Sequence, residues 1–272
     1  MTSEQRPRIA WALGGGGARG FAHLGVLKVL EEENIPVDAL AGTSMGAVMA
    51  VLFAAGTDLK YLSSLATSIS WEKFVDLRFP RYGLVEGKRI TPLLRLLTKG
   101  KKLEELDIPV RVIATDLLTG EEVIFEQGDT ELAVRASISI PGIFTPVLHG
   151  DKVFVDGGVV AGVPVAAARE MGMDLVIGVN VASEYDAVAP KNLFEVLYRT
   201  VDIMTKRLDQ IQTKEADLVI TPDVGKVGTV HFQRAEECIE KGEIATREAL
   251  PKIRKLIEEF QQKGEKQVEF GA

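Results

Sequence analysis

The sequence has 272 residues, of which 46% are hydrophobic and 26% are charged, and this composition is typical of a globular protein with a full hydrophobic core. Its formal net charge of −7 excludes long-range electrostatic attraction to nucleic acid or to an anionic membrane, so any lipid contact has to be local and largely apolar. No apolar run approaches the roughly 20 residues that a membrane-spanning helix needs.

The N-terminus and the cysteine content indicate the compartment. The only apolar segment near the N-terminus is Ile9–Leu13, whereas a secretory signal needs about 7 to 15 apolar residues and a cleavage site. The single cysteine, Cys238, excludes an intramolecular disulfide and a multi-cysteine metal site, and we expect it to be a small apolar filler on a helix. The sequence therefore predicts a cytoplasmic protein that meets a membrane, if at all, peripherally.

The first 56 residues predict a β-α-β-α arrangement. A short buried strand over 8–13 runs into the glycine-rich segment GGGGARG, and apolar residues at helical spacing follow as far as Asn34. The segment VDALAGTS predicts a second strand, and a mostly buried helix follows it and ends at Gly56. This alternation is typical of a parallel sheet, whose strands open their C-terminal turns at the same edge.

The rest of the chain predicts further strands and helices around the same sheet. In order, these are strands at 109–117 and 121–129, a helix from Asp129 to about Ser139, a hairpin over 145–158 that turns at Gly150 and Asp151, a helix opened by Pro164, a strand at 174–181, a long helix with an apolar stripe over 197–211, a short strand at 217–221 and two helices divided by Pro251.

The absence of repeats and low-complexity linkers from the sequence predicts a single domain over 1–272. Its class is α/β, with a mainly parallel central sheet flanked by helices. Within it we expect a core of about 9–181, a C-terminal strand and helices at 191–263, and a frayed tail at 264–272.

Ser44 lies between Gly42 and Gly46 at the predicted turn from strand to helix. A Gly-x-Ser-x-Gly in this context is a nucleophile elbow, in which a strained turn exposes the serine and the glycines let the strand and helix approach closely. The alternative is a glycine-rich turn in which Ser44 only caps the helix.

The glycine-rich segment after the first strand has two interpretations. Gly15, Gly17 and Gly20 fit a dinucleotide-binding pattern, but such a fold needs an acid at the end of the second strand, and the nearest acid, Asp38, lies at its start. Successive glycines before a helix instead expose backbone N–H groups that can stabilise an oxyanion. We expect Arg19 to hold this loop, with contact to a substrate phosphate as the alternative.

Three histidines are available as a general base for the candidate nucleophile. The chain order of an α/β-hydrolase would use His231, with Asp116 or Asp156 as its partner, but the nucleophile of that fold normally follows several strands rather than two. His149 lies near the tip of the predicted hairpin, on the order of 15 Å from Asp156. His23 follows the glycine-rich loop, where a buried hydrogen-bonding role is the better interpretation.

Asp156 ends the apolar strand in VFVDGG and is followed by Gly157 and Gly158. A carboxylate with an ordinary pKa of about 3.9 is a weak base, but burial raises its basicity. The alternative is a structural Asx turn.

The three motifs together resemble one family. GGGARG at 15–20, GTSMG at 42–46 and DGG at 156–158, in this order, are similar to those of the patatin-like phospholipases. The segments GGGGARGFAHLGVLKVLEE and SISIPGIFTPV resemble bacterial members related to neuropathy target esterase, and the resemblance covers roughly 9–181.

The resemblance implies a three-layer architecture and a lipid acyl hydrolase with a serine-aspartate dyad, no catalytic histidine, no metal and no cofactor. Ser44 then matches the nucleophile and Asp156 the base. The oxyanion hole would be formed by Gly15, Gly16, Gly17, Ala18 and Arg19, and the supporting motif glycines are Gly20, Gly42, Gly46, Gly157 and Gly158.

The expected function is hydrolysis of fatty-acyl esters of phospholipids, lysophospholipids or related lipids through an acyl-enzyme. One alternative is a small-ester or thioester hydrolase with a Ser-His-Asp triad, and another is a non-catalytic regulatory protein that retains the fold. The sequence leaves the oligomeric state open. Aromatic and basic residues alternate over 71–85, which suits transient contact with a membrane surface or a lid over an acyl pocket, with ordinary packing as the alternative.

Overall fold

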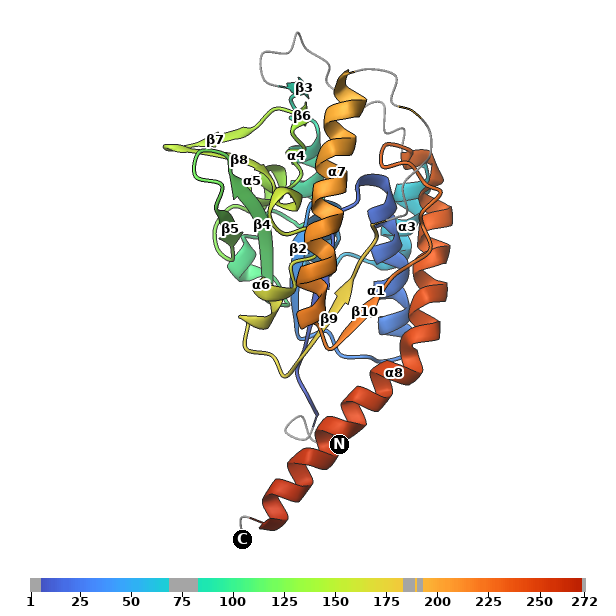
Figure 1. Ribbon diagram of the computed structural model, residues 1–272. Helices are drawn as coiled ribbons and strands as arrows, with labels where there is room; N and C mark the ends of the chain where they lie inside the picture. Colours follow the sequence, from blue (N-terminus) through green and yellow to red (C-terminus); the bar gives the residue numbers. More distant parts are fainter. Residues whose placement is uncertain (1–5, 69–82, 183–188, 190–192, 271–272) are drawn as a thin grey trace.

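A computed structural model describes residues 6–68, 83–182, 189 and 193–270, and these form an α/β fold around one central sheet (Figure 1). The described residues of this sheet make eight strands in the order β10-β9-β1-β2-β4-β8-β7, with β5 also paired to β4. The strands are β1 (Ile9–Leu13), β2 (Ala39–Thr43), β4 (Val110–Asp116), β5 (Glu122–Phe125), β7 (Val147–His149), β8 (Lys152–Asp156), β9 (Leu175–Val179) and β10 (Leu218–Ile220).

The strand directions confirm the prediction of a mainly parallel sheet. Strands β10, β9, β1, β2 and β4 run parallel to one another, whereas β5, β8 and β7 add antiparallel pairs at one side. Every residue of β1 and β2 is buried, which is the pattern of parallel strands covered on both faces. The hairpin predicted over 145–158 is confirmed as β7 and β8.

Helices cover both faces of the sheet, and the sequence of β1 shows how. Trp11 and Leu13 belong to a large core with α1 (Ala22–Glu32) and α2 (Met45–Ala54), whereas Ala10 and Ala12 pack with α6 (Val165–Arg169) on the other face. Alternate residues of a strand point to opposite faces, so the sheet separates two layers of helices. The other α-helices are α3 (Leu59–Ser68), α4 (Ile90–Leu97), α5 (Thr130–Ser137), α7 (Leu193–Gln212) and α8 (Ala235–Phe270).

The meeting of β2 and β8 on one edge of β4 brings distant parts of the chain together. Strand β2 runs parallel to β4 and its Thr43 pairs with Ile113, whereas β8 runs antiparallel and its Asp156 pairs with Ala114. Because β5 occupies the other edge of β4, the C-terminal ends of β2 and β8 face each other at adjacent positions. Residues 44 and 156 therefore meet although 112 positions separate them in the chain.

The C-terminal region corrects two expectations. Instead of two helices divided by Pro251, one helix, α8, contains this proline and bends along its course (Figure 1). A proline lacks one backbone donor and kinks a helix. Ion pairs to the C-terminal end of α1 and its C-cap residue lie on both sides of this proline, Arg247 with Glu32 and Arg254 with Glu33, and they support a continuous helix. The helix also continues to Phe270, where a frayed tail was expected from residue 264.

Several described elements were not predicted. These are α3, α4 and a small parallel sheet of β3 (Gly83–Val85) and β6 (Gly142–Phe144). Of the segment 71–85, residues 71–82 lie outside the described residues, so the lid or membrane hypothesis for them stays a prediction. No described helix has both the length and the apolar character to cross a membrane.

Candidate active site

Ser44 occupies a strained turn between β2 and α2. Its backbone has φ of 54° and ψ of −123°, a region that non-glycine residues seldom adopt. The neighbouring glycines are needed for close packing, because a Cβ at Gly46 would overlap the carbonyl of Leu13, and one at Gly42 would press on the backbone of Ala47. The local geometry is that of a nucleophile elbow.

A second serine holds the elbow and was missed by sequence reasoning. The backbone N–H of Ser44 donates to the hydroxyl of Ser137, at 2.8 Å, and Ser137 is fully buried at the C-terminal end of α5. The sequence signal was available in SISIPG, where serines alternate with isoleucines in a segment with few other polar residues. Its partner could not be read from the sequence because the contact spans 93 positions.

Asp156 accepts a hydrogen bond from the nucleophile candidate. The hydroxyl of Ser44 donates to Oδ2 of Asp156 at 2.6 Å, and the N–H of Gly158 donates to Oδ1 at 2.8 Å. Burial raises the pKa of Asp156 to about 6, against the opposing effect of these two hydrogen bonds. The same side chain thus forms the Asx turn and contacts the serine, and its pKa is closer to neutral pH than that of an exposed carboxylate.

Two backbone donors of the glycine-rich loop have no acceptor within the part of the chain that the structure describes. Gly15 donates its N–H to Gly162, Ala18 donates to Thr229, and Arg19 donates weakly to Gly16 at 3.2 Å. Among the described residues, no acceptor pairs with the N–H groups of Gly16 and Gly17. The loop lies against Ser44, since a Cβ at Gly15 would be 3.2 Å from the Cβ of Ser44.

Two buried side chains, His23 and Arg19, hold this loop in place through hydrogen bonds to backbone carbonyls. Nε2 of His23 lies 2.7 Å from the carbonyl oxygen of Gly14, to which it donates, and burial lowers the pKa of His23 to about 4. Nε of Arg19 donates to the carbonyl of Val227 at 2.6 Å. The expected structural roles of both residues are therefore confirmed.

The other candidates do not enter the site. His149 and His231 are exposed, and no histidine of the chain lines the cavity around Ser44. His149 pairs with Lys152, at the end of β8 away from Asp156. Cys238 is buried and desolvation raises its pKa to about 11, which confirms its interpretation as an apolar filler.

A cavity of about 70 Å³ surrounds the dyad candidates. Pockets that enclose drug-sized ligands measure roughly 300 to 1,000 Å³, so a long acyl chain has to extend beyond this cavity or widen it. Most of its lining comes from the glycine-rich loop, the dyad candidates with the segment after Asp156, and one face of α7, and Ile140, Pro141 and Ala182 complete it. The α7 residues are Val201, Asp202, Thr205, Lys206 and Asp209.

The face of α7 toward the cavity is polar and hydrogen-bonded to the backbone beneath it. Thr205 donates to the carbonyl of Gly158 at 2.7 Å, and Asp209 accepts from the N–H of Val163 at 3.0 Å. Lys206 is buried and forms an ion pair with Asp202 at 2.7 Å. Burial also raises the pKa of Asp209, to about 6. None of these side chains was singled out from the sequence.

The chain matches a model of the patatin-like phospholipase family over residues 12–169. It is 36% identical to an uncharacterized NTE family protein of Mycobacterium tuberculosis over 66% of this chain and 51% of the relative. It is 32% identical to the mouse patatin-like phospholipase domain-containing protein 7 over 64% of this chain and 14% of the relative. The chain spans about half the length of the first of these relatives.

Two solved structures share the fold. VipD from Legionella pneumophila superposes with a TM-score of 0.65 and 14% identity, over 91% of this chain and 67% of that protein. The type III effector ExoU gives a TM-score of 0.53 and 14% identity, over 93% of this chain and 56% of that protein. At this identity the likeness supports the architecture alone.

Proposed function

Because the chain belongs to the patatin-like phospholipase family, which implies a lipid acyl hydrolase, we propose that it cleaves fatty-acyl esters of phospholipids or lysophospholipids through a dyad of Ser44 and Asp156. One observation carries the proposal: the hydroxyl of Ser44, on a strained elbow, donates a 2.6 Å hydrogen bond to a buried carboxylate. A nucleophile in contact with a base of raised pKa is the arrangement that acyl transfer needs.

In the first half of the reaction, Oγ of Ser44 attacks the acyl carbon while its proton passes to Oδ2 of Asp156. The tetrahedral intermediate collapses when the bond to the alcohol oxygen breaks, and Asp156 returns the proton to that oxygen. The products of this half are the free alcohol, which is the lysolipid or headgroup part, and a fatty-acyl ester on Ser44.

In the second half, water attacks the acyl-enzyme and gives its proton to Asp156. The second intermediate collapses with Oγ of Ser44 as the leaving group, Asp156 returns the proton to it, and the fatty acid is released. No metal or cofactor takes part in this scheme.

We assign the oxyanion hole chiefly to Gly16 and Gly17 among the five residues from Gly15 to Arg19. Their N–H groups have no acceptor among the described residues, whereas those of Gly15, Ala18 and Arg19 already donate to backbone carbonyls. Preorganised donors of this kind stabilise the charge that develops on the carbonyl oxygen.

A Ser-His-Asp triad has no support from the geometry, because His149 and His231 are exposed and His23 donates to a carbonyl of the loop. A purely regulatory protein would not need the contact between Ser44 and Asp156. We further propose a cytoplasmic enzyme that meets membranes peripherally, and the hypothesis that 71–85 contacts the lipid rests on sequence alone.

The test combines covalent labelling with kinetics. A fluorophosphonate probe should label the wild type and not Ser44→Ala. Asp156→Asn should reduce hydrolysis of a soluble nitrophenyl ester by about 10² to 10⁴, the usual cost of losing a general base. A phospholipid panel with mass spectrometry of the products then identifies the lipid class.

The matched controls are His149→Ala and His231→Ala, which should retain activity within about tenfold because neither side chain reaches the cavity. Labelling that persists in folded Ser44→Ala, or an active Asp156→Asn beside an inactive His231→Ala, would overturn the dyad.

A further inference from the structure

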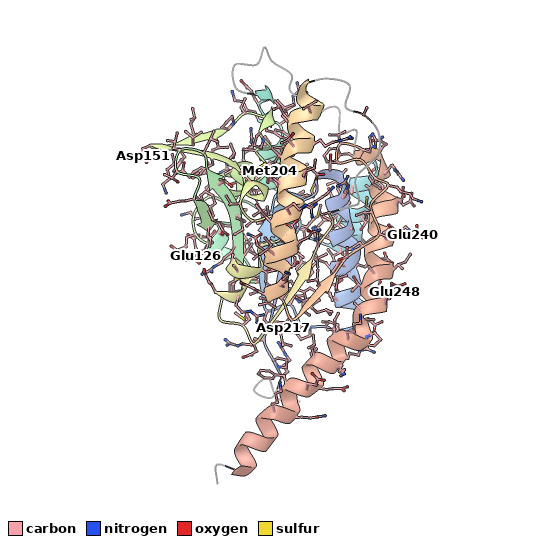
Figure 2. All side chains as sticks on the ribbon, viewed as in Figure 1. Glu126, Asp151, Met204, Asp217, Glu240 and Glu248 are labelled. Atoms are coloured by element: carbon pink, nitrogen blue, oxygen red, sulfur yellow. The ribbon has the colours of Figure 1, made fainter. Side chains whose placement is uncertain are left out.

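The helix α7 exposes an apolar face to solvent. We call this set the outward face of α7; its members recur at separations of seven and eight residues, which is two helical turns, and therefore lie on one side of the helix. Its members and their exposed fractions are Val196 (44%), Leu197 (50%), Ile203 (41%), Met204 (62%) and Ile211 (64%). Figure 2 labels Met204 on this helix, which crosses the front of the molecule.

The orientation of α7 is the reverse of that expected for a helix on a globular domain. Such a helix normally turns its apolar stripe to the core and its polar residues to water. Here Asp202, Thr205 and Lys206 line the cavity around Ser44 with Val201, whereas the five apolar residues of the outward face are exposed. A contiguous exposed apolar stripe indicates a contact surface.

The charges of α7 indicate what kind of surface the outward face contacts. Asp202 and Asp209 both line the cavity, and Arg207 is exposed beside Ile203 and Ile211, one helical turn from each. In the described part of α7, the outward side therefore combines apolar side chains with a cation and no carboxylate. This local pattern contrasts with the net charge of −7 for the chain and complements an anionic lipid surface.

We propose that the outward face of α7 is the surface with which the protein docks on an anionic lipid bilayer. The inference rests on the proposed function, because a lipid hydrolase has to take its substrate from such a surface. One helix then presents its apolar side to the acyl region of the bilayer and its polar side to Ser44, so docking brings the catalytic cavity to within one helix of the lipid.

The test measures binding separately from hydrolysis. The full chain with Ser44→Ala is sedimented with vesicles of phosphatidylcholine and phosphatidylglycerol, and the same protein carrying Ile203→Ser, Met204→Ser and Ile211→Ser is compared. Losing three apolar contacts should weaken vesicle binding on the order of tenfold or more. Arg207→Gln should weaken it about fivefold on these vesicles, and less on phosphatidylcholine alone.

The matched control replaces three exposed leucines outside α7, two directly after β4 and one in the edge strand β7, as Leu117→Ser, Leu118→Ser and Leu148→Ser, and should bind vesicles like the parent. In the active background, the α7 triple variant should lose vesicle hydrolysis and keep hydrolysis of a soluble ester within about twofold, because none of its three residues lines the cavity.

Three outcomes overturn the inference: unaltered vesicle binding by the α7 triple variant, no vesicle binding by the parent, or a change only in oligomeric state, which would assign the face to a second copy. A protein that docks through α7 but hydrolyses no ester contradicts the proposed function and leaves the docking surface intact.

Discussion

Ser44 has an unfavourable backbone conformation, and its surroundings must hold it there. A non-glycine residue at a φ of 54° costs of order 1 to 3 kcal/mol, so the conformation persists only where neighbouring contacts enforce it. The hydrogen bond from its N–H to Ser137 is one such contact, and it is made by the backbone rather than by the hydroxyl that binds Asp156. Ser137 is therefore a positioning residue for the nucleophile.

Ser137→Ala should lower kcat for a soluble ester by about tenfold or more, because the buried N–H of Ser44 loses its acceptor, at a cost of about 1 to 3 kcal/mol. Ser139→Ala is the matched control. Its hydroxyl accepts from Arg135 and does not contact the elbow, so this variant should lose stability without a comparable loss of kcat. Equal kcat values in the two variants would contradict the positioning role.

The pH dependence of kcat/KM follows from the burial of Asp156. The base must be ionised, and since desolvation raises its pKa to about 6, activity should be present above that pH and fall as the pH drops through it. A histidine base, with an ordinary pKa of about 6.5, gives a similar limb at one temperature. The temperature dependence of the limb separates the two bases. A carboxylic acid has a small ionisation enthalpy, so its pKa hardly changes with temperature, whereas imidazolium has a large one and its pKa falls on warming. A limb that moves to lower pH on warming would rule out Asp156.

The candidate dyad was predictable at the residue scale because short motifs carry it. Ser44 and Asp156 both follow strands and adjoin glycines, and these local patterns are visible in the sequence. The residues that support these motifs could not be predicted from the sequence. Ser137, Thr205 and Asp209 reach the site through contacts between segments far apart in the chain.

At the scale of elements, α7 is held over the cavity by hydrogen bonds. Thr205 donates to Gly158, Gln212 donates to Val160, and Asp209 accepts from Val163, so three side chains of one helix bind the segment that follows Asp156. Gly158 in turn donates to the carboxylate of Asp156. Movement of α7 is thereby linked to the position of the base.

Thr205→Val keeps the shape of the side chain and removes one of these bonds. It should cost about 1 kcal/mol and speed amide hydrogen exchange in α7 and in residues 157–163. Thr200→Val makes the same change at an exposed position of the same helix, where the hydroxyl donates to the carbonyl of Val196 within the helix. If exchange in residues 157–163 is the same in both variants, α7 does not restrain that segment.

The elements that sequence patterns predicted are those with strong local signals. The opening β-α-β-α unit and the hairpin of β7 and β8 have periodic apolar residues and glycine turns. Helix α3 is rich in Ser and Thr, and the hydroxyls of Ser63 and Thr67 bond back to carbonyls of its own backbone, which obscures the helical pattern. Strands β3 and β6 have three residues each and pair across 59 positions, so no local signal identifies them.

At the scale of the whole molecule, the site depends on strand pairing that no local pattern determines. The sequence predicts β2 and β8 as strands, but nothing in either segment specifies that both pair with the same edge of β4 and meet end to end. Gly157 permits this junction, because a Cβ there would overlap the carbonyl of Ile113. The family resemblance predicted that Ser44 and Asp156 act together, and the pairing of β2 and β8 with β4 explains how they meet.

The buried carboxylate of this site should also lower the stability of the whole protein. In the unfolded chain Asp156 has an ordinary pKa of about 3.8, whereas in the folded protein burial raises it to about 6. Below about pH 4 both states hold the proton and the group has no effect. Between these values the unfolded chain releases the proton first, so the free energy of unfolding falls as the pH rises, and above about pH 6 the loss is complete.

Asp156→Asn removes the ionisation and should therefore be more stable than the wild type above pH 6, although it is inactive. A difference of about two in pKa corresponds to a gain of at most about 3 kcal/mol in the free energy of unfolding. The altered contact with Ser44 reduces this gain. Thermal unfolding of both proteins from pH 4 to pH 8 measures the effect. The melting temperature of the variant should exceed that of the wild type by a margin that grows with pH up to about 6 and then stays constant. A difference in melting temperature that stays constant over this range would mean that burial does not raise the pKa of Asp156. The dyad mechanism, which depends on that raised pKa, would then lose its support.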